Sequence, residues 1–266
     1  MLAGILPAGV ESAEVFGGEC DEGELFPEEA ALVAGASAKR RREFTGVRVC
    51  ARLALVRAGV RPAPIMPGPS GAPRWPPGIV GSMTHCDGYR AAAVGRADTF
   101  AAIGIDAEPD EMLPGSVLPR VASESERTAL AGLAAVAPGF CWDRILFSAK
   151  ESVFKAWFPA TGRRLGFSDA EVELDESGSF AAHLLVPGPV VGGRRVATYD
   201  GFWAVSRGLV VTAVGAGRVP GSLERGACEQ VSEVRLARRG ATREDVVELG
   251  DRLGVTAFQE ERAAQA

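Results

Sequence analysis

The chain has 266 residues, of which 47% are hydrophobic and 24% charged, and its formal net charge is −5. This composition is typical of a globular protein and excludes a disordered, collagen-like or coiled-coil chain. Proteins that act on nucleic acid usually carry a basic surplus, which is absent here. The length suits one large domain or two smaller ones.

The cysteine pattern favours a reducing compartment, and the hydropathy pattern favours a chain without a membrane-spanning helix. The five cysteines are scattered without a CxxC pair, so a disulfide framework is not expected. No run approaches the roughly 18 apolar residues of a membrane-spanning helix. No lysine or arginine precedes Lys39, unlike the start of a signal peptide. We therefore expect a cytoplasmic protein without a membrane or nucleic-acid partner.

The expected elements alternate between helices and short strands. Residues 27–55 predict one or two helices, with a break at 34–37. The density of proline and glycine over 61–77 predicts a loop. The remaining expected elements are the apolar segments 79–80 and 91–94, a buried strand at 101–105, helices at 124–133 and 142–158, and strands at 172–174, 183–186, 196–205 and 209–214.

Two acidic residues follow the expected strand 101–105. If the strand continues, Asp106 and Glu108 point to the same face, with Cα atoms about 6.5–7 Å apart. Neighbouring carboxylates repel each other unless they share a cation, and oxygen-only ligands favour Mg²⁺ or Mn²⁺ over zinc. The alternative is a turn at the end of a strand with two exposed acids.

Two of the three lysines in the chain lie in the expected helix 142–158. Glu151 and Lys155 are four residues apart and share a helix face. The compact ammonium groups of Lys150 and Lys155 suit contacts to phosphate oxygens, and a lysine shares its proton with a leaving oxygen more readily than an arginine. The alternative is a capping box that begins at Ser148, with an ordinary solvated Glu–Lys pair.

Arginines and a histidine form a third group of candidates. Helical spacing places Arg41, Arg48 and Arg52 on one ridge, and residues 81–86 place His85 beside Ser and Thr in a turn of small residues, where it could bind an anion. The alternatives are a solvated basic face and a structural histidine. Together with a cation site, these groups fit a ligand with several negative charges, such as a nucleotide pyrophosphate with a further phosphate.

Three segments carry a family resemblance. Residues 81–86 (GSMTHC), 104–108 (GIDAE) and 147–155 (FSAKESVFK) resemble the ordered signatures of 4′-phosphopantetheinyl transferases. The subtype is the one that activates surfactin, enterobactin and mycobacterial polyketide or peptide synthases. The resemblance covers about residues 15–215 and extends to further segments, namely 39–44, 47–52, 142–146, 155–159 and 165–167.

The resemblance implies an α+β fold with two pseudo-symmetric α/β subdomains and the active site in the cleft between them. We expect an N-terminal subdomain at 1–105, a C-terminal subdomain at 106–218, and a helical extension at 219–266 that has no counterpart in the family. The implied enzyme transfers the 4′-phosphopantetheine arm of coenzyme A to a serine of an apo acyl or peptidyl carrier protein and releases 3′,5′-ADP.

The implied partners are carrier proteins of polyketide, peptide or fatty-acid synthases, and the implied chain is a monomer. The implied metal is Mg²⁺, with Mn²⁺ as an option, held by Asp106, Glu108 and Glu151. Glu151 is a metal ligand, the general base, or both, and Lys155 assists the leaving group. The implied coenzyme A ligands are Arg40, Arg48, Thr84, His85, Lys150, Lys155 and Phe167, the last beside the pantetheine channel.

Two other functions fit parts of the sequence. A metal-dependent nuclease would need its acid and lysine on adjacent strands, whereas both lysines here follow a helical pattern. A non-catalytic protein that binds coenzyme A or a carrier protein would not need the acids and Lys155 together. The attacking serine comes from the partner, which agrees with the lack of a Ser/His/Asp constellation in this chain.

Overall fold

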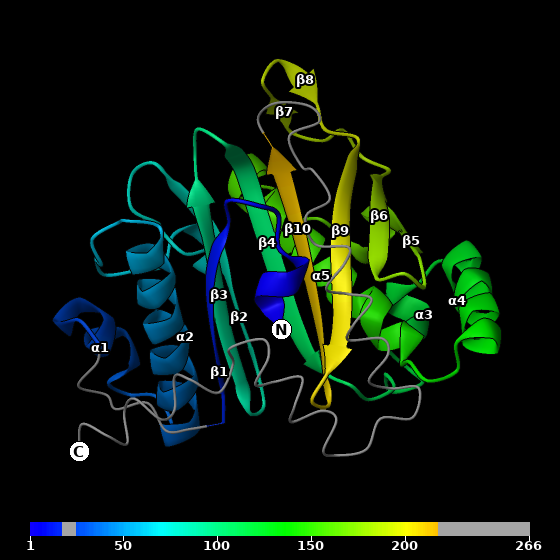
Figure 1. The fold of residues 1–266 in the computed structure, drawn as a ribbon, viewed down its shortest axis with the longest axis horizontal. Coiled ribbons are helices and arrows are strands. Elements are labelled where there is room, and N and C mark those ends of the chain that lie inside the picture. Colours follow the sequence, from blue (N-terminus) through cyan, green and yellow to red (C-terminus); the bar gives the residue numbers. More distant parts are fainter. Residues whose placement is uncertain (18–24, 218–266) are drawn as a thin grey trace. The chain divides into compact units, whose positions relative to one another are not determined.

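The computed structural model describes residues 1–17 and 25–217, and the predicted extension at 219–266 lies outside them. The α+β class is confirmed by two antiparallel sheets and the helices packed on them (Figure 1). A three-stranded sheet has the order β1-β3-β2, and a five-stranded sheet has the order β4-β10-β9-β6-β5. Each sheet is covered by one 20-residue helix, α2 or α5.

The three-stranded sheet belongs to the N-terminal part of the chain. Its main helix begins after Ser37, whose hydroxyl accepts a hydrogen bond from the Arg40 amide at 3.3 Å. Small and apolar side chains of this helix pack on β1 and β3 and form a buried cluster that includes Cys50, Ala51 and Leu55. The elements are β1 (Glu11–Phe16), α1 (Pro27–Val33), α2 (Ala38–Arg57), β2 (Ile79–Cys86) and β3 (Tyr89–Arg96).

The five-stranded sheet and α5 enclose the larger core. Gly104 on β4 lies so close to this helix that a Cβ atom would stand 1.9 Å from the carbonyl oxygen of Ser152. The absence of a side chain at 104 therefore sets the distance between strand and helix. The elements are β4 (Phe100–Pro109), α3 (Leu118–Val121), α4 (Glu124–Val136), α5 (Trp142–Thr161), β5 (Ala170–Leu174), β6 (Ser179–Leu184), β9 (Thr198–Ser206) and β10 (Leu209–Gly217), with a small ribbon of β7 (Val190–Val191) and β8 (Arg194–Arg195).

The two sheets meet where β2 lies beside β4 (Figure 1). Side-chain hydroxyls make this junction: Ser82 Oγ accepts a hydrogen bond from the Ile105 amide at 3.1 Å, and Thr84 Oγ1 accepts one from the Ala107 amide at 3.2 Å. Both hydroxyl residues are buried. The hydroxyls thus take the place that main-chain carbonyls hold in an ordinary strand ladder.

The structure extends and corrects the expected elements. The helix break at 34–37 and the strand that continues through Asp106 and Glu108 are confirmed. Residues 82–86 form part of β2 rather than a turn, because Ser82 and Thr84 point toward β4 and bond to it. Strand β1 was not predicted. The expected boundary between residues 105 and 106 falls inside β4.

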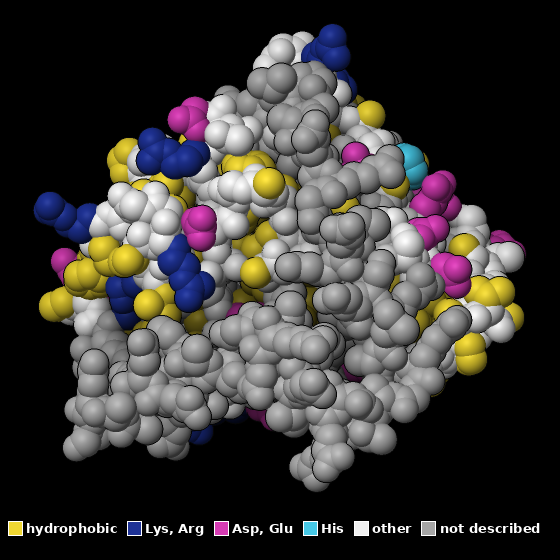
Figure 2. All heavy atoms as spheres, in the orientation of Figure 1, with side chains coloured by type: hydrophobic (Ala, Val, Ile, Leu, Met, Phe, Trp, Pro, Cys, Tyr) yellow, Lys and Arg dark blue, Asp and Glu magenta, His cyan; other side chains and the backbone are white. Residues whose placement is uncertain are grey.

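Charged side chains are unevenly spread over the face drawn in Figure 2. Lys and Arg lie mainly on the side that holds α1 and α2 and at the β7–β8 ribbon, whereas Asp and Glu gather mainly on the side of β5, β6 and α4. Within the described residues, no helix has the length and apolar character to cross a membrane.

Candidate active site

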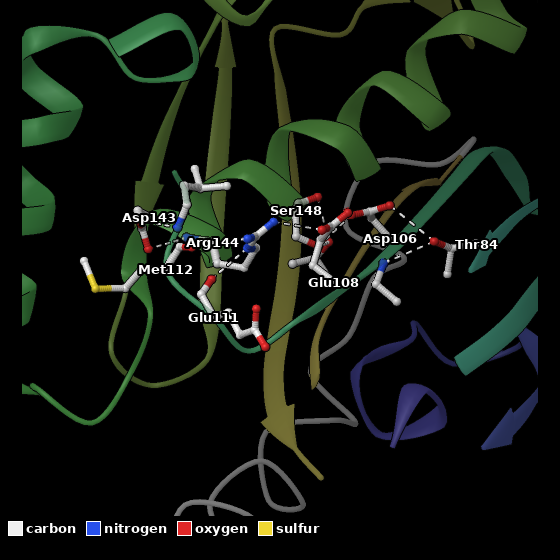
Figure 3. A network of polar contacts seen from close by, with 11 residues as sticks. Thr84, Asp106, Glu108, Glu111, Met112, Asp143, Arg144 and Ser148 are labelled. Atoms are coloured by element: carbon white, nitrogen blue, oxygen red, sulfur yellow. Dashed lines mark hydrogen bonds and ion pairs between the residues drawn. The ribbon is translucent and has the colours of Figure 1, made fainter. Parts of the chain in front are cut away.

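The site is centred on the buried carboxylate of Asp106. Its Oδ1 accepts hydrogen bonds from Lys155 Nζ at 2.7 Å and from Thr84 Oγ1 at 3.2 Å, and its Oδ2 accepts one from Ser148 Oγ at 2.9 Å. Thr84 comes from β2, Asp106 from β4 and Ser148 from α5 (Figure 3), and Lys155 lies on α5 as well. The carboxylate therefore joins the two sheets and the helix at one point.

Two further carboxylates lie within the electrostatic reach of Asp106. Burial, and after it the charge of Asp106, raise the pKa of Glu108 to about 7, although Arg144 and Lys155 act in the opposite direction. The pKa of Glu151 is raised by the same two causes, and Lys155 lowers it. Asp106 thus repels both Glu108 and Glu151, and Lys155 partly compensates the charge.

A polar stripe along α5 supplies most of these contacts. Arg144, Ser148, Glu151 and Lys155 are spaced four, three and four residues apart, which places them on one helix face. Arg144 Nη1 donates to Glu108 Oε2 at 3.0 Å, as Ser148 and Lys155 do to Asp106. The sequence analysis used the Glu151–Lys155 spacing and offered a capping box at Ser148 as the alternative. The structure excludes that capping box, because Ser148 lies inside α5.

Arg144 also connects Glu108 to the loop after β4. Its Nε donates to the carbonyl of Glu111 at 2.8 Å, and the amide of Leu113 donates to Asp143 Oδ2 at 2.8 Å (Figure 3). Met112 on this loop is 75% exposed. Two adjacent residues of α5 thus hold the loop and leave a large apolar side chain in solvent.

A cavity of about 280 Å³ opens beside Lys155. Among the predicted ligands of coenzyme A, Arg40, Arg48, His85 and Lys155 line it. Its walls also contain residues 70–73 of the loop before β2 and apolar side chains from α2, β2 and α5, chiefly Phe44, Val47, Met83, Phe154 and Phe158. The arrangement suits a ligand with an anionic part and an extended apolar part.

His85 lies among cations in this cavity. Its Nε2 is 3.6 Å from Glu43 Oε2. Burial lowers the pKa of His85, and the charges of Arg40, Lys155 and Arg90 lower it further, while Glu43 raises it. An anion bound here would favour the protonated imidazole.

Lys150 and Phe167 lie apart from the cavity lining. Lys150 is buried, and its ammonium donates to the carbonyls of Val121 and Phe167 and to Glu126 Oε2, at 2.9, 2.8 and 2.8 Å. The ring of Phe167 packs against that of Phe147 with centroids 5.8 Å apart. Lys150 is one residue before Glu151, so it points from a different face of α5.

The oxygen donors of Asp106, Glu108 and Glu151 suit a hard divalent cation in their chemistry. The raised pKa values are consistent with this, because a cation would offset the mutual repulsion of the carboxylates. Among residues 1–17 and 25–217, however, no three acidic, histidine or cysteine side chains are grouped as a ready metal site. In the structure Lys155 and Arg144 contact two of the acids.

Both halves of the chain match models of known protein families. Residues 28–95 match the model of the 4′-phosphopantetheinyl transferase N-terminal domain, and residues 102–202 match that of the 4′-phosphopantetheinyl transferase superfamily. The two matched ranges contain every residue discussed above as part of the site.

Curated relatives agree with these matches. The chain is 55% identical to the 4′-phosphopantetheinyl transferase Svp of Streptomyces mobaraensis over 230 aligned residues. This alignment covers 85% of this chain and 94% of the relative. The chain is 46% identical over 228 residues to PptT of Mycobacterium tuberculosis, covering 80% and 99%. It is 32% identical over 188 residues to enterobactin synthase component D of Salmonella typhimurium, covering 70% and 76%.

These matches extend over both sheets and the site between them. They confirm the predicted family and activity, with coenzyme A as the donor that this family uses and carrier proteins as its substrates. The chain belongs to the 4′-phosphopantetheinyl transferase superfamily and is a 4′-phosphopantetheinyl transferase.

Proposed function

We propose that the chain, acting as a monomer, transfers the phosphopantetheine arm of coenzyme A to a serine of apo carrier proteins of polyketide, peptide or fatty-acid synthases. The observation that carries the proposal is the cluster of Asp106, Glu151 and Lys155 beside a cavity lined by cations. Phosphoryl transfer depends mainly on positioning and on compensation of negative charge, and this cluster can provide both.

In this proposal, Arg40, Arg48 and His85 bind the 3′-phosphate of coenzyme A at the cationic wall of the cavity. Lys155 lies between that wall and Asp106, where its ammonium can contact the pyrophosphate and donate a proton to the leaving oxygen. Thr84 holds the carboxylate of Asp106 from the side of β2.

Glu151 serves as the general base. Burial and the charge of Asp106 raise its pKa, which makes it a stronger proton acceptor than an exposed glutamate. It accepts the proton of the carrier serine as the serine oxygen attacks the β-phosphate. The bond from phosphorus to the 3′,5′-ADP oxygen breaks, and Lys155 supplies the proton or the charge that this oxygen needs.

Asp106 and Glu108, with Glu151 as a third ligand, would hold Mg²⁺ or Mn²⁺. The cation would compensate the charge of the pyrophosphate in the transition state. Lys150 is left out of the phosphate ligands, because three interior oxygens already accept its hydrogen bonds. We assign Lys150 a structural role in holding α5 against its neighbours. We assign Phe167, which packs on Phe147, a structural role in placing the short turn 167–169 against α5.

The test is the intact mass of an apo carrier protein after incubation with the chain, coenzyme A and Mg²⁺. The reaction adds a phosphopantetheine group of roughly 340 Da, and EDTA should prevent the addition. Glu151→Gln should bind coenzyme A almost as well as the wild type and add no mass. Full turnover by this variant would refute the base role, and coenzyme A binding without any transfer by the wild type would favour a binding protein.

A further inference from the structure

A buried carboxylate lies behind the arginines of α2. Glu29 on α1 is 0% exposed. Its Oε1 accepts a hydrogen bond from the Ile65 amide at 2.8 Å, and its Oε2 accepts one from Arg52 Nη1 at 2.9 Å and one from the Phe26 amide at 3.2 Å. An ionised carboxylate is costly to bury unless it is paired and hydrogen-bonded, and Glu29 meets both conditions.

Ile65 connects this carboxylate to the cavity. Its amide donates to Glu29, and its carbonyl accepts a hydrogen bond from Arg48 Nη2 at 3.4 Å. Residue 65 lies in the loop between α2 and β2 and is itself fully buried. The carboxylate on α1 therefore fixes the loop residue against which an arginine of the cavity wall is placed.

Arg48 is held on two sides and keeps donor capacity for a ligand. Its guanidinium carbon lies 3.7 Å from the centroid of the Phe44 ring, a cation–π contact that fixes the plane of the group. Its Nε is buried and finds no hydrogen-bond partner among the residues that the structure describes. Arg48 lines the cavity, so an anionic ligand there can contact the outer Nη donors of its guanidinium.

The charge of Glu29 also acts on Arg48. The pKa of Arg48 is lowered to about 10, chiefly by burial; the charge of Glu29 raises this pKa, whereas the charges of Arg40 and Arg52 lower it. Without the carboxylate, three arginines of α2 would face one another with less compensation. Repulsion among them would then favour movement of Arg48 out of the wall.

We propose that Glu29 is a positioning residue for coenzyme A: through Ile65 it holds the Arg48 guanidinium in the cavity wall, where it binds the 3′-phosphate. This inference rests on the proposed function of Arg48 as a 3′-phosphate ligand. Glu29 has no exposed surface and contacts no ligand itself, so its effect on binding passes through Arg48.

The competing explanation is that Glu29 only ties α1 to α2 and the loop. A general loosening of the fold would weaken every ligand of the cavity to a similar extent. Loss of the Arg48 position would weaken only ligands that carry the 3′-phosphate. Dephospho-coenzyme A lacks this phosphate and keeps the pyrophosphate and pantetheine, so the ratio of the two affinities separates the explanations.

The experiment measures the Kd of coenzyme A and of dephospho-coenzyme A by calorimetry on one preparation of each variant. The ratio of the two Kd values is independent of the folded fraction, because both ligands meet the same protein. The variants are Glu29→Gln, Arg48→Gln and the control Glu14→Gln. Glu14 also accepts hydrogen bonds, from Tyr89 Oη and the Leu2 amide, but its neighbours in β1 pack on α2, so it lies on the opposite sheet face.

For the wild type, coenzyme A should bind more tightly than dephospho-coenzyme A. Arg48→Gln should reduce this preference most, and Glu29→Gln should reduce it by about tenfold, the usual value of one hydrogen bond to a charged group. Glu14→Gln should leave the preference unchanged. If Glu29→Gln does not fold, Glu29→Asp keeps the charge but shortens the side chain, and it should also reduce the preference.

Two results would overturn the inference. If Arg48→Gln reduces the preference and the folded Glu29 variant retains the wild-type ratio, Glu29 has only a structural role and the proposed function of Arg48 stands. If Arg48→Gln itself leaves the ratio unchanged, Arg48 does not read the 3′-phosphate, and its proposed role fails together with that of Glu29.

Discussion

The contact between β4 and α5 at Gly104 predicts a large effect from a single methyl group. In Gly104→Ala, the new Cβ would stand 1.9 Å from the Ser152 carbonyl oxygen and 2.8 Å from the Ala156 amide nitrogen, both of them backbone atoms. Neither can rotate away, so helix and strand must separate by about 1.5 Å to reach ordinary contact. Overpacking of this kind costs about 3 kcal/mol of unfolding free energy.

The same shift reaches the site, because Lys155 lies beside Ala156 on the displaced part of α5 and its ammonium is 2.7 Å from Asp106. Misplacement of a catalytic group by about 1 Å can reduce a rate about 100-fold. Denaturant unfolding gives the change in stability, and the initial rate of carrier modification, measured at a temperature where the variant is folded, gives the change in activity.

Gly132→Ala is the matched control. Gly132 lies on an exposed face of α4, where a new Cβ would meet nothing within 4 Å. Alanine should stabilise this helix by up to about 1 kcal/mol and leave the rate unchanged. If Gly104→Ala unfolded within about 0.5 kcal/mol of the wild type and kept its rate, the close contact between helix and strand would be refuted.

Three further perturbations test the charged groups. The pKa of Glu108 is about 7 in the folded state against an ordinary 4.5, so the folded state binds more protons between these values and the free energy of unfolding falls as the pH rises through them. With EDTA present, Glu108→Gln should raise the free energy of unfolding at pH 8 by about 1–3 kcal/mol and remove this pH dependence. An unchanged pH dependence in the variant would contradict the assignment. Lys150→Met leaves the buried Glu126 without its cation and should cost about 3–5 kcal/mol in denaturant unfolding; adding Glu126→Leu should recover part of this loss, and no loss from Lys150→Met would show that the pair is solvated. Ser148→Ala removes a donor to Asp106 Oδ2 and should lower kcat about tenfold with little change in the KM for the carrier; a change confined to KM would place Ser148 in binding.

Local patterns in the sequence predicted the long elements. The period of the apolar residues predicted α5, because a helix face is specified by neighbours three and four residues away, and the run of small residues at 34–37 predicted the break between α1 and α2. Strand β1 was missed because the strand that pairs with it, among the residues that the structure describes, is β3, about 75 residues later in the chain. Residues 82–86 were taken for a turn because Ser and Thr are common in turns, whereas here their hydroxyls join β4.

For the site, the sequence motifs identified Asp106, Glu151 and Lys155, and the structure brings them together. The partners that hold them required knowledge of tertiary contacts. Whether Lys150 faces the cavity or the interior depends on which face of α5 covers the sheet, and a motif does not encode this. The connection from Glu29 to Arg48 passes through residue 65, more than 30 positions from Glu29, so no local pattern indicates it.

The hydroxyl junction between β2 and β4 has a mechanical consequence. Two ordinary antiparallel strands share a continuous series of main-chain hydrogen bonds and can separate only if the whole series breaks. Here the side chains of Ser82 and Thr84 each accept one amide hydrogen bond from β4, and a side chain can rotate about its own bonds while both strands remain intact. The contact between the sheets therefore depends on the side-chain torsions of residues 82 and 84, so loss of either hydroxyl would weaken this contact while the main-chain pairing of β2 with β3 and of β4 with β10 stays intact.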